Sequence, residues 1–259
     1  MSVVLADLES RKVKVSNVLI SQPEPAVDSP YQKLKEKYGV KLDFKQFIKV
    51  ESVPYKEFRK EKIDVLAHTA VIFTSRNAVD NYFRICKEAK IEVPADMKYF
   101  CISDQTAYYL QKYITIRKRK LFVGEKVATD MFSLFKKHAS EKYLFPCSNI
   151  RKDDIPDYLK NNGYDCTEAV MYQTVAADLS AIKDINYDII AFYSPSGVAS
   201  LFTNFPNFEQ KKTRIAAFGP TTAKAVRDAG LILDIEAPMP NAPSMTGALE
   251  LYIKEANKK

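Results

Sequence analysis

The 259-residue chain has few of the residues that mark several common protein classes. Its two histidines, His68 and His138, stand seventy positions apart, which leaves almost no material for a histidine-rich metal site or a Ser-His-Asp triad. No apolar run approaches the roughly 18–20 residues needed to span a bilayer, so an integral membrane protein is excluded. With only seven glycines, the chain contains neither GxxxxGK[ST] nor GxGxxG, which argues against a nucleotide-dependent enzyme.

The four cysteines contain no CxxC pair and stand 15, 46 and 19 positions apart. This spacing is typical of buried thiols in a reducing compartment rather than of a disulfide or zinc framework. Asp7 and Glu9 interrupt the N-terminal segment before an apolar stretch develops, which is not the pattern of a secretory signal. We therefore expect a cytoplasmic protein that binds no metal. The cysteines are Cys86, Cys101, Cys147 and Cys166.

The charged residues are unbalanced in favour of the basic ones. Lysine and arginine number 39 against 32 acidic residues, so the net charge is +7 and the isoelectric point is near 9.0. Such a balance favours an anionic partner, which can be nucleic acid, a phosphate or a polycarboxylate. Composition alone does not choose among these three.

Predicted strands and amphipathic helices alternate along the chain. Several strands are short continuous apolar runs, as expected for parallel strands buried on both faces, so the predicted fold class is α/β. We expect strands at Val15–Ser21, Phe44–Val53, Ala70–Thr74, Lys98–Ser103, Lys120–Val123, Tyr143–Cys147, Thr167–Val175, Asp188–Tyr193, Arg214–Phe218 and Ile232–Glu236. We expect helices at Pro30–Tyr38, Asn77–Lys90, Gln105–Tyr113, Thr129–His138, Ile155–Asn162, Gly197–Phe202, Thr222–Ala229 and Ser244–Glu255.

The sequence also repeats itself. VIFTSRNAVDNYF at 71–83 aligns with IAFYSPSGVASLF at 190–202 at a constant offset of 119. CISDQTA at 101–107 aligns with AFGPTTA at 217–223 at an offset of 116. Two matches in the same order with nearly equal offsets indicate duplicated α/β units, and therefore two similar domains.

No Gly/Ser/Pro-rich linker separates two tandem domains, but two stretches alternate apolar and polar residues as half-exposed antiparallel strands do. These linker strands lie near 41–53 and 165–177. If they pair as a two-stranded β-ladder, the segment 54–166 is an inserted α/β domain. The outer α/β domain is then discontinuous and comprises 1–48 and 176–259.

Hydroxyl residues recur where the predicted strands end and helices begin. In parallel sheets, ligands bind at the carboxyl ends of the strands, and helix N-termini there favour carboxylates or phosphates. At any single position a helix cap is the sufficient explanation. Together these residues fit a ligand with many negative groups. They are Thr74, Ser75, Ser103, Ser148, Ser194, Ser196, Thr221, Thr222 and Ser244.

Two further features have simple structural explanations. Tyr172 in a linker strand is typical of a strand-surface aromatic, but facing a cleft its phenol would be a neutral donor with a pKa near ~10. The basic run Arg117–Lys120 is four residues long and has no interleaved aromatics for stacking on bases. A solvated strand edge explains it better than nucleic-acid binding.

Taken together, the sequence motifs at these strand–helix junctions resemble those of the uroporphyrinogen-III synthase family of tetrapyrrole biosynthesis. The resemblance is densest from residue 144 to the end and thinner from 1 to 65. SPSGV at 194–198 and RIAAFGPTTAKAVRDAGL at 214–231 are the most specific of the matching motifs. The others are FTSRNAV at 73–79, SDQTA at 103–107, LFPCSNIRKDDIPDYLKNNGY at 144–164, VMYQT at 170–174 and APSMTGAL at 242–249.

The resemblance implies two α/β domains joined by a two-stranded β-ladder, one inserted into the other, with no metal or organic cofactor. It implies a cyclising hydro-lyase whose substrate, hydroxymethylbilane, is a linear tetrapyrrole with eight carboxylates. Water leaves, and the macrocycle closes through a spiro intermediate with the last pyrrole ring inverted. The spontaneous product is the uninverted isomer, so the protein's task is to hold the chain in one geometry.

The resemblance also implies roles for particular residues. Tyr172 corresponds to the family tyrosine proposed to help the hydroxyl leave, as a general acid or hydrogen-bond donor. Because no residue supplies a nucleophile, we expect single substitutions to cost up to roughly tenfold in rate. The substrate's carboxylates would be bound by Thr74, Ser75, Thr106, Ser194, Ser196, Gly197, Thr221 and Thr222.

A rival hypothesis is a non-catalytic two-domain binding protein that closes on an anionic ligand. A third is nucleic-acid binding through the basic surface, which predicts steep salt dependence. The intact VMYQT and GPTT motifs favour the enzyme over both. We expect it to act on a small molecule as a monomer, without nucleic acid or membrane, in transient contact with hydroxymethylbilane synthase.

Overall fold

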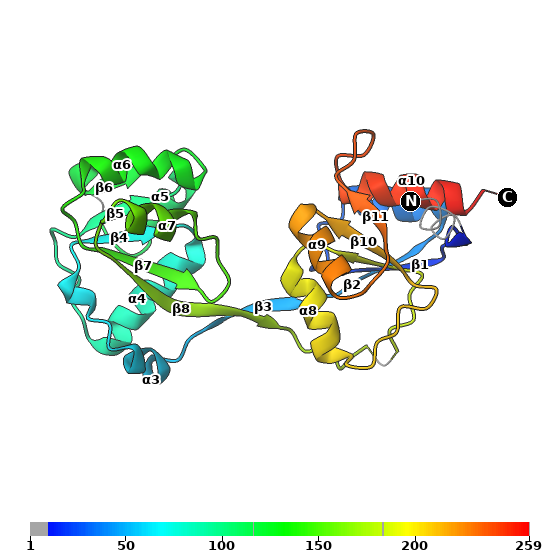
Figure 1. The fold of residues 1–259 in the computed structure, drawn as a ribbon, viewed down its shortest axis with the longest axis horizontal. Coiled ribbons are helices and arrows are strands. Elements are labelled where there is room, and N and C mark those ends of the chain that lie inside the picture. Colours follow the sequence, from blue (N-terminus) through cyan, green and yellow to red (C-terminus); the bar gives the residue numbers. More distant parts are fainter. Residues whose placement is uncertain (1–9, 116, 183, 259) are drawn as a thin grey trace. The chain divides into compact units, whose positions relative to one another are not determined.

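The computed structural model describes residues 10–115, 117–182 and 184–258, which form two compact units drawn in Figure 1. Unit 1 comprises Met1–Lys49 and Val175–Lys259, and unit 2 comprises Val50–Thr174. In each unit helices flank a mostly parallel sheet, which confirms the predicted α/β class. That each unit is an independently folding domain remains a prediction.

The described residues of unit 1 contain a parallel sheet with the strand order β11-β10-β9-β1-β2. A helix follows four of its five strands along the chain, and the exception is β2, where the chain leaves the unit. The elements are β1 (Asn17–Ile20), α2 (Pro30–Tyr38), β2 (Lys41–Phe44), β9 (Ile189–Phe192), α8 (Pro195–Asn204), β10 (Arg214–Phe218), α9 (Pro220–Asp228), β11 (Leu233–Ala237) and α10 (Met245–Ala256).

The described residues of unit 2 contain a second sheet with the order β3-β8-β7-β4-β5-β6. Strands β4 to β8 pair in parallel. The strands are β3 (Ile48–Ser52), β4 (Ala70–Phe73), β5 (Lys98–Cys101), β6 (Leu121–Val123), β7 (Tyr143–Ser148) and β8 (Cys166–Ala176). The helices are α3 (Tyr55–Phe58), α4 (Arg76–Ala89), α5 (Asp104–Leu110), α6 (Phe132–Lys137) and α7 (Asp154–Asn161), with 3₁₀ turns η1 (Arg59–Glu61), η2 (Val65–Ala67), η3 (Lys118–Lys120) and η4 (Ala128–Met131).

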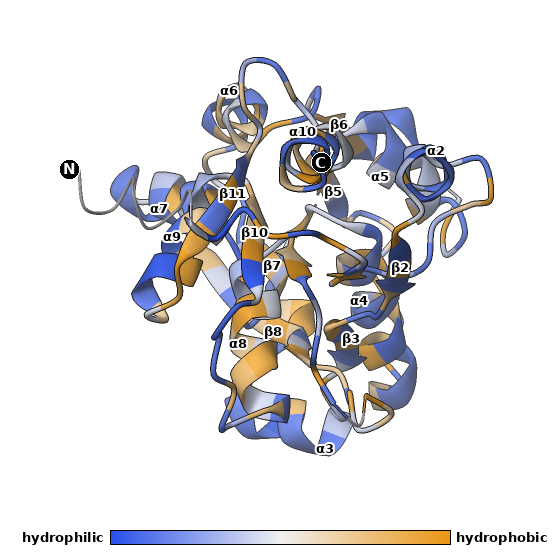
Figure 2. Cartoon of the chain, turned by 90° about the vertical axis from the view of Figure 1, so that its right-hand side faces the viewer, coloured by the Kyte–Doolittle hydropathy of each residue, from blue (hydrophilic) through white to orange (hydrophobic). Residues whose placement is uncertain are grey.

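Each sheet buries both of its faces, because alternate residues of its central strands point into different cores. In β4, Val71 and Phe73 pack with α4 and α5, whereas Ala70 and Ile72 pack with α6 and α7. In β9, the odd-numbered Ile189 and Ala191 pack with α2 and α10, and the even-numbered residues pack with α8 and α9. Figure 2 shows the hydrophobic colouring on buried strands such as β7 and on α8, while α2 is largely hydrophilic.

The structure corrects the prediction that residues 41–53 form one β-rich stretch. β2 ends at Phe44 and pairs in parallel with β1 in unit 1, and β3 begins at Ile48 beside β8. Phe47 lies in the break, fully buried with its ring edge against Phe192, so the chain turns there to fill a core. The Val53 N–H donates to the Met171 carbonyl, and the Ala177 N–H donates to the Phe47 carbonyl. These two hydrogen bonds show that the two segments run antiparallel. That this pairing joins two domains stays a prediction.

Most other predicted elements appear with ends shifted by one or two residues. The predicted helix over 129–138 is shorter, because η4 precedes α6. The 3₁₀ turn η3, within the basic run, leads directly into β6, which is the edge strand that the charge pattern predicted. His68 follows η2, and His138 is the C-cap of α6. In the described part of the chain, no helix combines the length and apolar character needed to cross a bilayer.

Candidate functional site

Each sheet has one point at which the connections along the chain reverse direction, and ligands bind at such points in parallel sheets. In unit 2 the point lies between β4 and β7, where the chain returns to the far side of β4 after β6. In unit 1 it lies between β1 and β9. Most of the residues predicted to bind carboxylates follow strands next to these two points. The structure therefore groups them by unit, with Thr74, Ser75, Thr106 and Tyr172 in unit 2.

Two predicted residues from distant parts of the sequence, Tyr172 and Ser75, are in contact. The Tyr172 hydroxyl lies 3.1 Å from the Ser75 Oγ, although the two residues are 97 positions apart. Ser75 is the N-cap of α4 and accepts a hydrogen bond from the Ala78 N–H at 3.1 Å. Tyr172 is 7% exposed. The helix cap thus fixes the serine, and the serine in turn orients the phenol.

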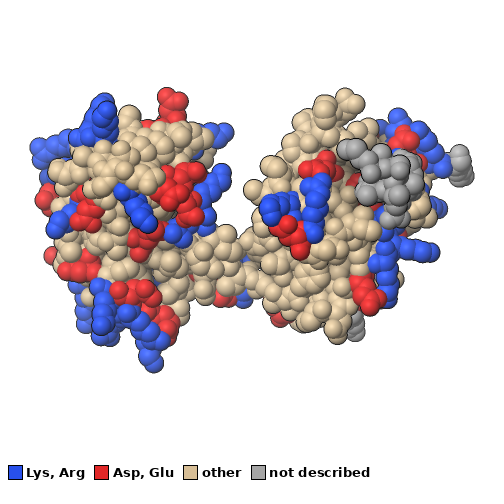
Figure 3. All heavy atoms as spheres, viewed as in Figure 1, with Lys and Arg blue, Asp and Glu red and all other residues tan. Residues whose placement is uncertain are grey.

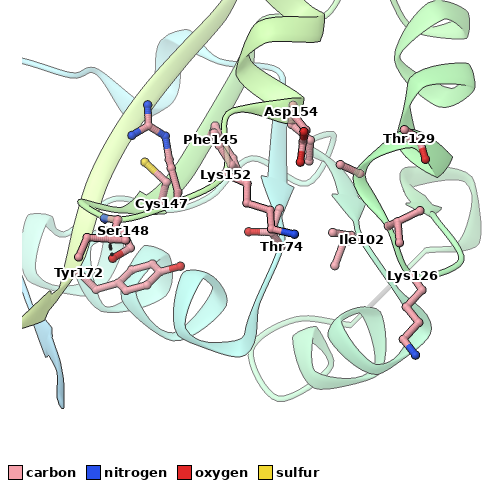
Figure 4. A pocket seen from close by; sticks show the side chains of 15 residues that line it. Thr74, Ile102, Lys126, Thr129, Phe145, Cys147, Ser148, Lys152, Asp154 and Tyr172 are labelled. Carbon is pink, nitrogen blue, oxygen red and sulfur yellow. Dashed lines mark hydrogen bonds between the residues drawn. The ribbon is translucent and has the colours of Figure 1, made fainter. Parts of the chain in front are cut away.

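Tyr172 also lines a pocket of about 430 Å³ that lies within unit 2 and is drawn in Figure 4. The pocket opens where β4, β5, β6 and β7 end. Thr74 and Ile102 contribute to its floor from the residues that follow β4 and β5. One wall comes from Lys126 in the β6–η4 loop and Thr129 in η4, and the other from the β7–α7 loop with the start of α7. The predicted residues Thr74 and Tyr172 therefore face one cavity.

The protonation states suit a neutral donor in this pocket. Burial raises the pKa of Tyr172 above that of an ordinary phenol, and the hydrogen bond with Ser75 opposes the shift. The phenol therefore stays protonated at neutral pH. Cys147 also lines the pocket, and burial raises the pKa of its thiol to about 11. It is present as the unreactive thiol rather than as a thiolate nucleophile.

In unit 1 the predicted residues occupy two neighbouring helix starts. Ser194 caps α8, and its Oγ accepts the Gly197 N–H at 3.1 Å. Ser196 is half-buried beside it, and Gly197 is buried. Gly219 precedes α9 with a φ of 85°, in the left-handed region, and Thr221 is exposed on the first turn. Because β9 and β10 pair in parallel, both helix N-termini lie at the same edge of the sheet.

Thr106 and Thr222 occupy equivalent buried positions. Each is the third residue of its helix, and they are 5% and 2% exposed. The Thr106 hydroxyl lies 3.4 Å from the Oγ of Ser103, the cap of α5. Thr106 is not among the residues that line the pocket. A direct contact of either threonine with a ligand therefore stays a prediction.

Sequence reasoning did not single out the four charged residues that line the pocket, namely Lys126, Arg151, Lys152 and Asp154. The loops that carry them follow β6 and β7, at the same edge as Thr74. Their position directly after predicted buried strands could therefore have identified them as candidate ligand-binding residues. Figure 3 shows basic and acidic groups interspersed over the visible face of each unit, so this view contains no continuous basic tract of the kind nucleic acid requires.

The described residues contain no group of three or more His, Cys, Asp or Glu side chains placed to hold a metal ion. All four cysteines are free thiols. Cys86, Cys101 and Cys147 are buried, as predicted, and Cys166 is partly exposed. The backbone N–H of His68 donates to the Val65 carbonyl, and its ring Nδ1 lies 2.8 Å from the Asp64 carbonyl oxygen.

Comparisons with known proteins agree with the geometry. Residues 29–247 match the model of the family described as "Uroporphyrinogen-III synthase HemD". A uroporphyrinogen-III synthase of Saccharomyces cerevisiae is 26% identical over 144 residues, which cover 50% of this chain and 52% of that protein. One from Chlorobaculum parvum is 23% identical over 253 residues, covering 93% of this chain and 100% of that protein.

Solved structures show the same fold. A uroporphyrinogen-III synthetase from Helicobacter pylori gives a TM-score of 0.57 at 19% identity and covers 92% of this chain and 99% of that one. A mutant uroporphyrinogen III synthase from Thermus thermophilus gives 0.52 at 16% identity, with 93% and 99% covered. At these identities the structural likeness supports the fold alone.

Proposed function

Since the chain belongs to the uroporphyrinogen-III synthase family, we propose that it cyclises hydroxymethylbilane to uroporphyrinogen III. The reaction expels the terminal hydroxyl as water and closes the ring with the last pyrrole inverted. The observation that carries the proposal is the Tyr172 phenol, which is buried, protonated and held by Ser75 at the wall of the pocket.

We assign the protons of this pair from its contacts. A serine hydroxyl donates one hydrogen bond and accepts two. Ser75 already accepts the Ala78 N–H, so its own proton is available for the Tyr172 oxygen. The phenol then directs its proton into the pocket, toward the departing hydroxyl. As that proton transfers, the serine stabilises the negative charge that develops on the phenol oxygen.

The remaining predicted residues bind rather than react in this proposal. The starts of α8 and α9 present hydroxyl side chains and partly positive helix ends to carboxylates. Thr74 offers a hydroxyl at the pocket floor. Binding an otherwise flexible chain in one geometry decides which end of the last ring attacks. The ring-inverted product therefore depends on many weak contacts.

We also propose that the protein works as a cytoplasmic monomer and takes its substrate in transient contact with hydroxymethylbilane synthase. The monomer is the part of this proposal that can be measured on the isolated protein. Size-exclusion chromatography with light scattering tests it directly, and a dimer at micromolar concentration would contradict it.

A coupled assay tests the activity. Hydroxymethylbilane is generated in situ by its own synthase, with and without this protein, and the oxidised porphyrin isomers are separated chromatographically. We expect a switch from isomer I to isomer III. Isomer I alone, from protein shown to be folded by circular dichroism, would refute the activity and favour a non-catalytic binding protein for an anionic ligand.

A further inference from the structure

Four charged residues line the pocket and have no part in the proton transfer, namely Lys126, Arg151, Lys152 and Asp154. Lys126 lies in the β6–η4 loop, Lys152 in the β7–α7 loop, and Asp154 is the first residue of α7. Within the described residues, neither lysine ammonium has an ion-pair or hydrogen-bond partner. The neighbouring Arg151 differs, because its guanidinium pairs with Glu168 and lies 3.5 Å from Asp153. The two lysines are thus the uncompensated cations of this pocket.

Figure 4 shows how these groups are arranged. In this view Lys152 extends from the β7–α7 loop toward Thr74, and Asp154 lies at the start of α7. Lys126 lies on the opposite loop and extends outward at the rim. The pocket therefore has one cation toward its floor, a second at its mouth, and one carboxylate at the start of α7.

The rest of the lining suits a flat apolar ring. Ile102, Phe145 and Ile150 contribute hydrocarbon surface between the charged groups. The volume of about 430 Å³ is within the usual range of small-molecule pockets, and suits one substituted aromatic ring rather than a chain of four. A ring with short acidic arms would place apolar surface on apolar surface and its carboxylates at the ammonium groups.

We propose that this pocket is a subsite for a single pyrrole ring carrying two carboxylate arms. Lys152 binds one carboxylate, Lys126 binds the other at the rim, and the Asp154 carboxylate accepts the pyrrole N–H. The identity of the ligand as part of a linear tetrapyrrole rests on the proposed function. The subsite places one ring beside the Tyr172 phenol, where the hydroxyl departs.

Binding of a monopyrrole to the full-length protein tests the subsite without turnover. The probe is a pyrrole with one carboxymethyl and one carboxyethyl arm, measured by isothermal titration calorimetry at low salt. Both lysines are exposed. We expect Lys152→Ala, toward the pocket floor, to weaken binding up to about tenfold, as for a lost charge-assisted hydrogen bond, and Lys126→Ala, at the rim, about two- to threefold. Lys152→Arg should restore most of the affinity.

Lys160→Ala is the matched control, because Lys160 is an exposed lysine in the last turn of α7, the helix that follows Lys152, and does not line the pocket. It should leave the affinity unchanged, and the neutral diamide of the probe should not compete. No binding to the wild type, or equal affinities of Lys152→Ala and Lys160→Ala, would overturn the subsite. Binding that also tolerates the diamide would overturn the role of the lysines.

The two proposals can fail separately. Monopyrrole binding that depends on Lys152, in a protein that yields only isomer I, would retain the subsite and reject the proposed activity. Isomer III formation with a KM that Lys152→Ala does not raise would retain the activity and reject the subsite. For the subsite we expect Lys152→Ala to raise KM about tenfold while kcat changes less than twofold.

Discussion

The two units have the same spatial order of strands, but they differ in which strand comes first along the chain. Reading each sheet from its β2 or β8 side, the order β2-β1-β9-β10-β11 in unit 1 matches β8-β7-β4-β5-β6 in unit 2. The repeated motifs fall on equivalent elements, β4-α4-β5-α5 and β9-α8-β10-α9. Unit 1 is thus a circular permutation of unit 2, since its β1 and β2 correspond to β7 and β8. The offsets near 119 cover only the segment in which the chain order is unchanged.

The comparison also shows that a common scaffold carries different chemistry at equivalent positions. Ser75 and Ser194 cap equivalent helices, but only Ser75 contacts a tyrosine phenol. At the next helix start, Ser103 caps α5 in unit 2, whereas Gly219 with its positive φ precedes α9 in unit 1. We infer that unit 2 supplies the proton donor and unit 1 mainly binds charge. Substitutions at paired positions test this division.

The largest effect is expected from truncating the equivalent buried phenylalanines. Phe73 and Phe192 end β4 and β9, and both are fully buried. Phe73→Ala and Phe192→Ala should each lower the free energy of unfolding of their own unit by about 3–5 kcal/mol. Hydrogen exchange of peptides from each unit in increasing urea measures the two separately. Equal loss of protection in both units from one substitution would show that they unfold as a single domain.

A smaller effect is expected where the two helix starts differ. Gly219→Ala should destabilise unit 1 by about 1–2 kcal/mol, because φ is 85° there, although an added Cβ would meet open space. Ser103→Gly at the equivalent position of unit 2 should cost only about a few tenths of a kcal/mol. Urea denaturation of both variants checks this. Equal losses would mean that the left-handed backbone is not what selects glycine.

Tyr172→Phe should lower kcat by up to roughly tenfold without unfolding the protein, because it removes one hydrogen-bond donor from a preorganised pocket. The matched control is Tyr187→Phe, which removes a phenol 2.9 Å from Asp43 at the amino end of β9. It should cost stability and leave kcat unchanged. The coupled assay with both variants measures the difference, and full activity of Tyr172→Phe would remove its role as a donor.

The smallest effect concerns the pH dependence of unit 2. Burial raises the pKa of Glu141, but hydrogen bonds from Lys98 and Thr69 outweigh burial and lower the pKa overall. A carboxyl with a lowered pKa stabilises the fold above its unfolded pKa, and this contribution is lost as the pH falls through the folded pKa. Glu141→Gln should therefore cost about 0.5 kcal/mol at pH 7, allowing for solvent screening, and less near pH 3. A constant difference between these pH values, measured by urea denaturation, would contradict this.

Local patterns predicted much of this molecule from the sequence. Apolar runs such as AVIF at 70–73 identified strands buried on both faces, and Ser75 and Ser194 were recognisable as helix caps. These predictions hold because hydrophobic periodicity and cap chemistry act within a few residues. The stretch 41–53 was misread as continuous because alternation marks half-buried strands, but does not reveal that Phe47 turns into a core.

The sequence by itself determined the α/β class, the duplicated segments and the set of residues at the strand ends. Only the tertiary structure decided the permuted order of the sheets, the contact of Tyr172 with Ser75 across 97 positions, and the meeting of Lys126, Lys152 and Asp154 around one pocket. The physical reason is that the burial of a strand follows from the hydrophobicity of its own residues. Which strands become its neighbours depends on crossovers whose closure and packing involve the whole unit.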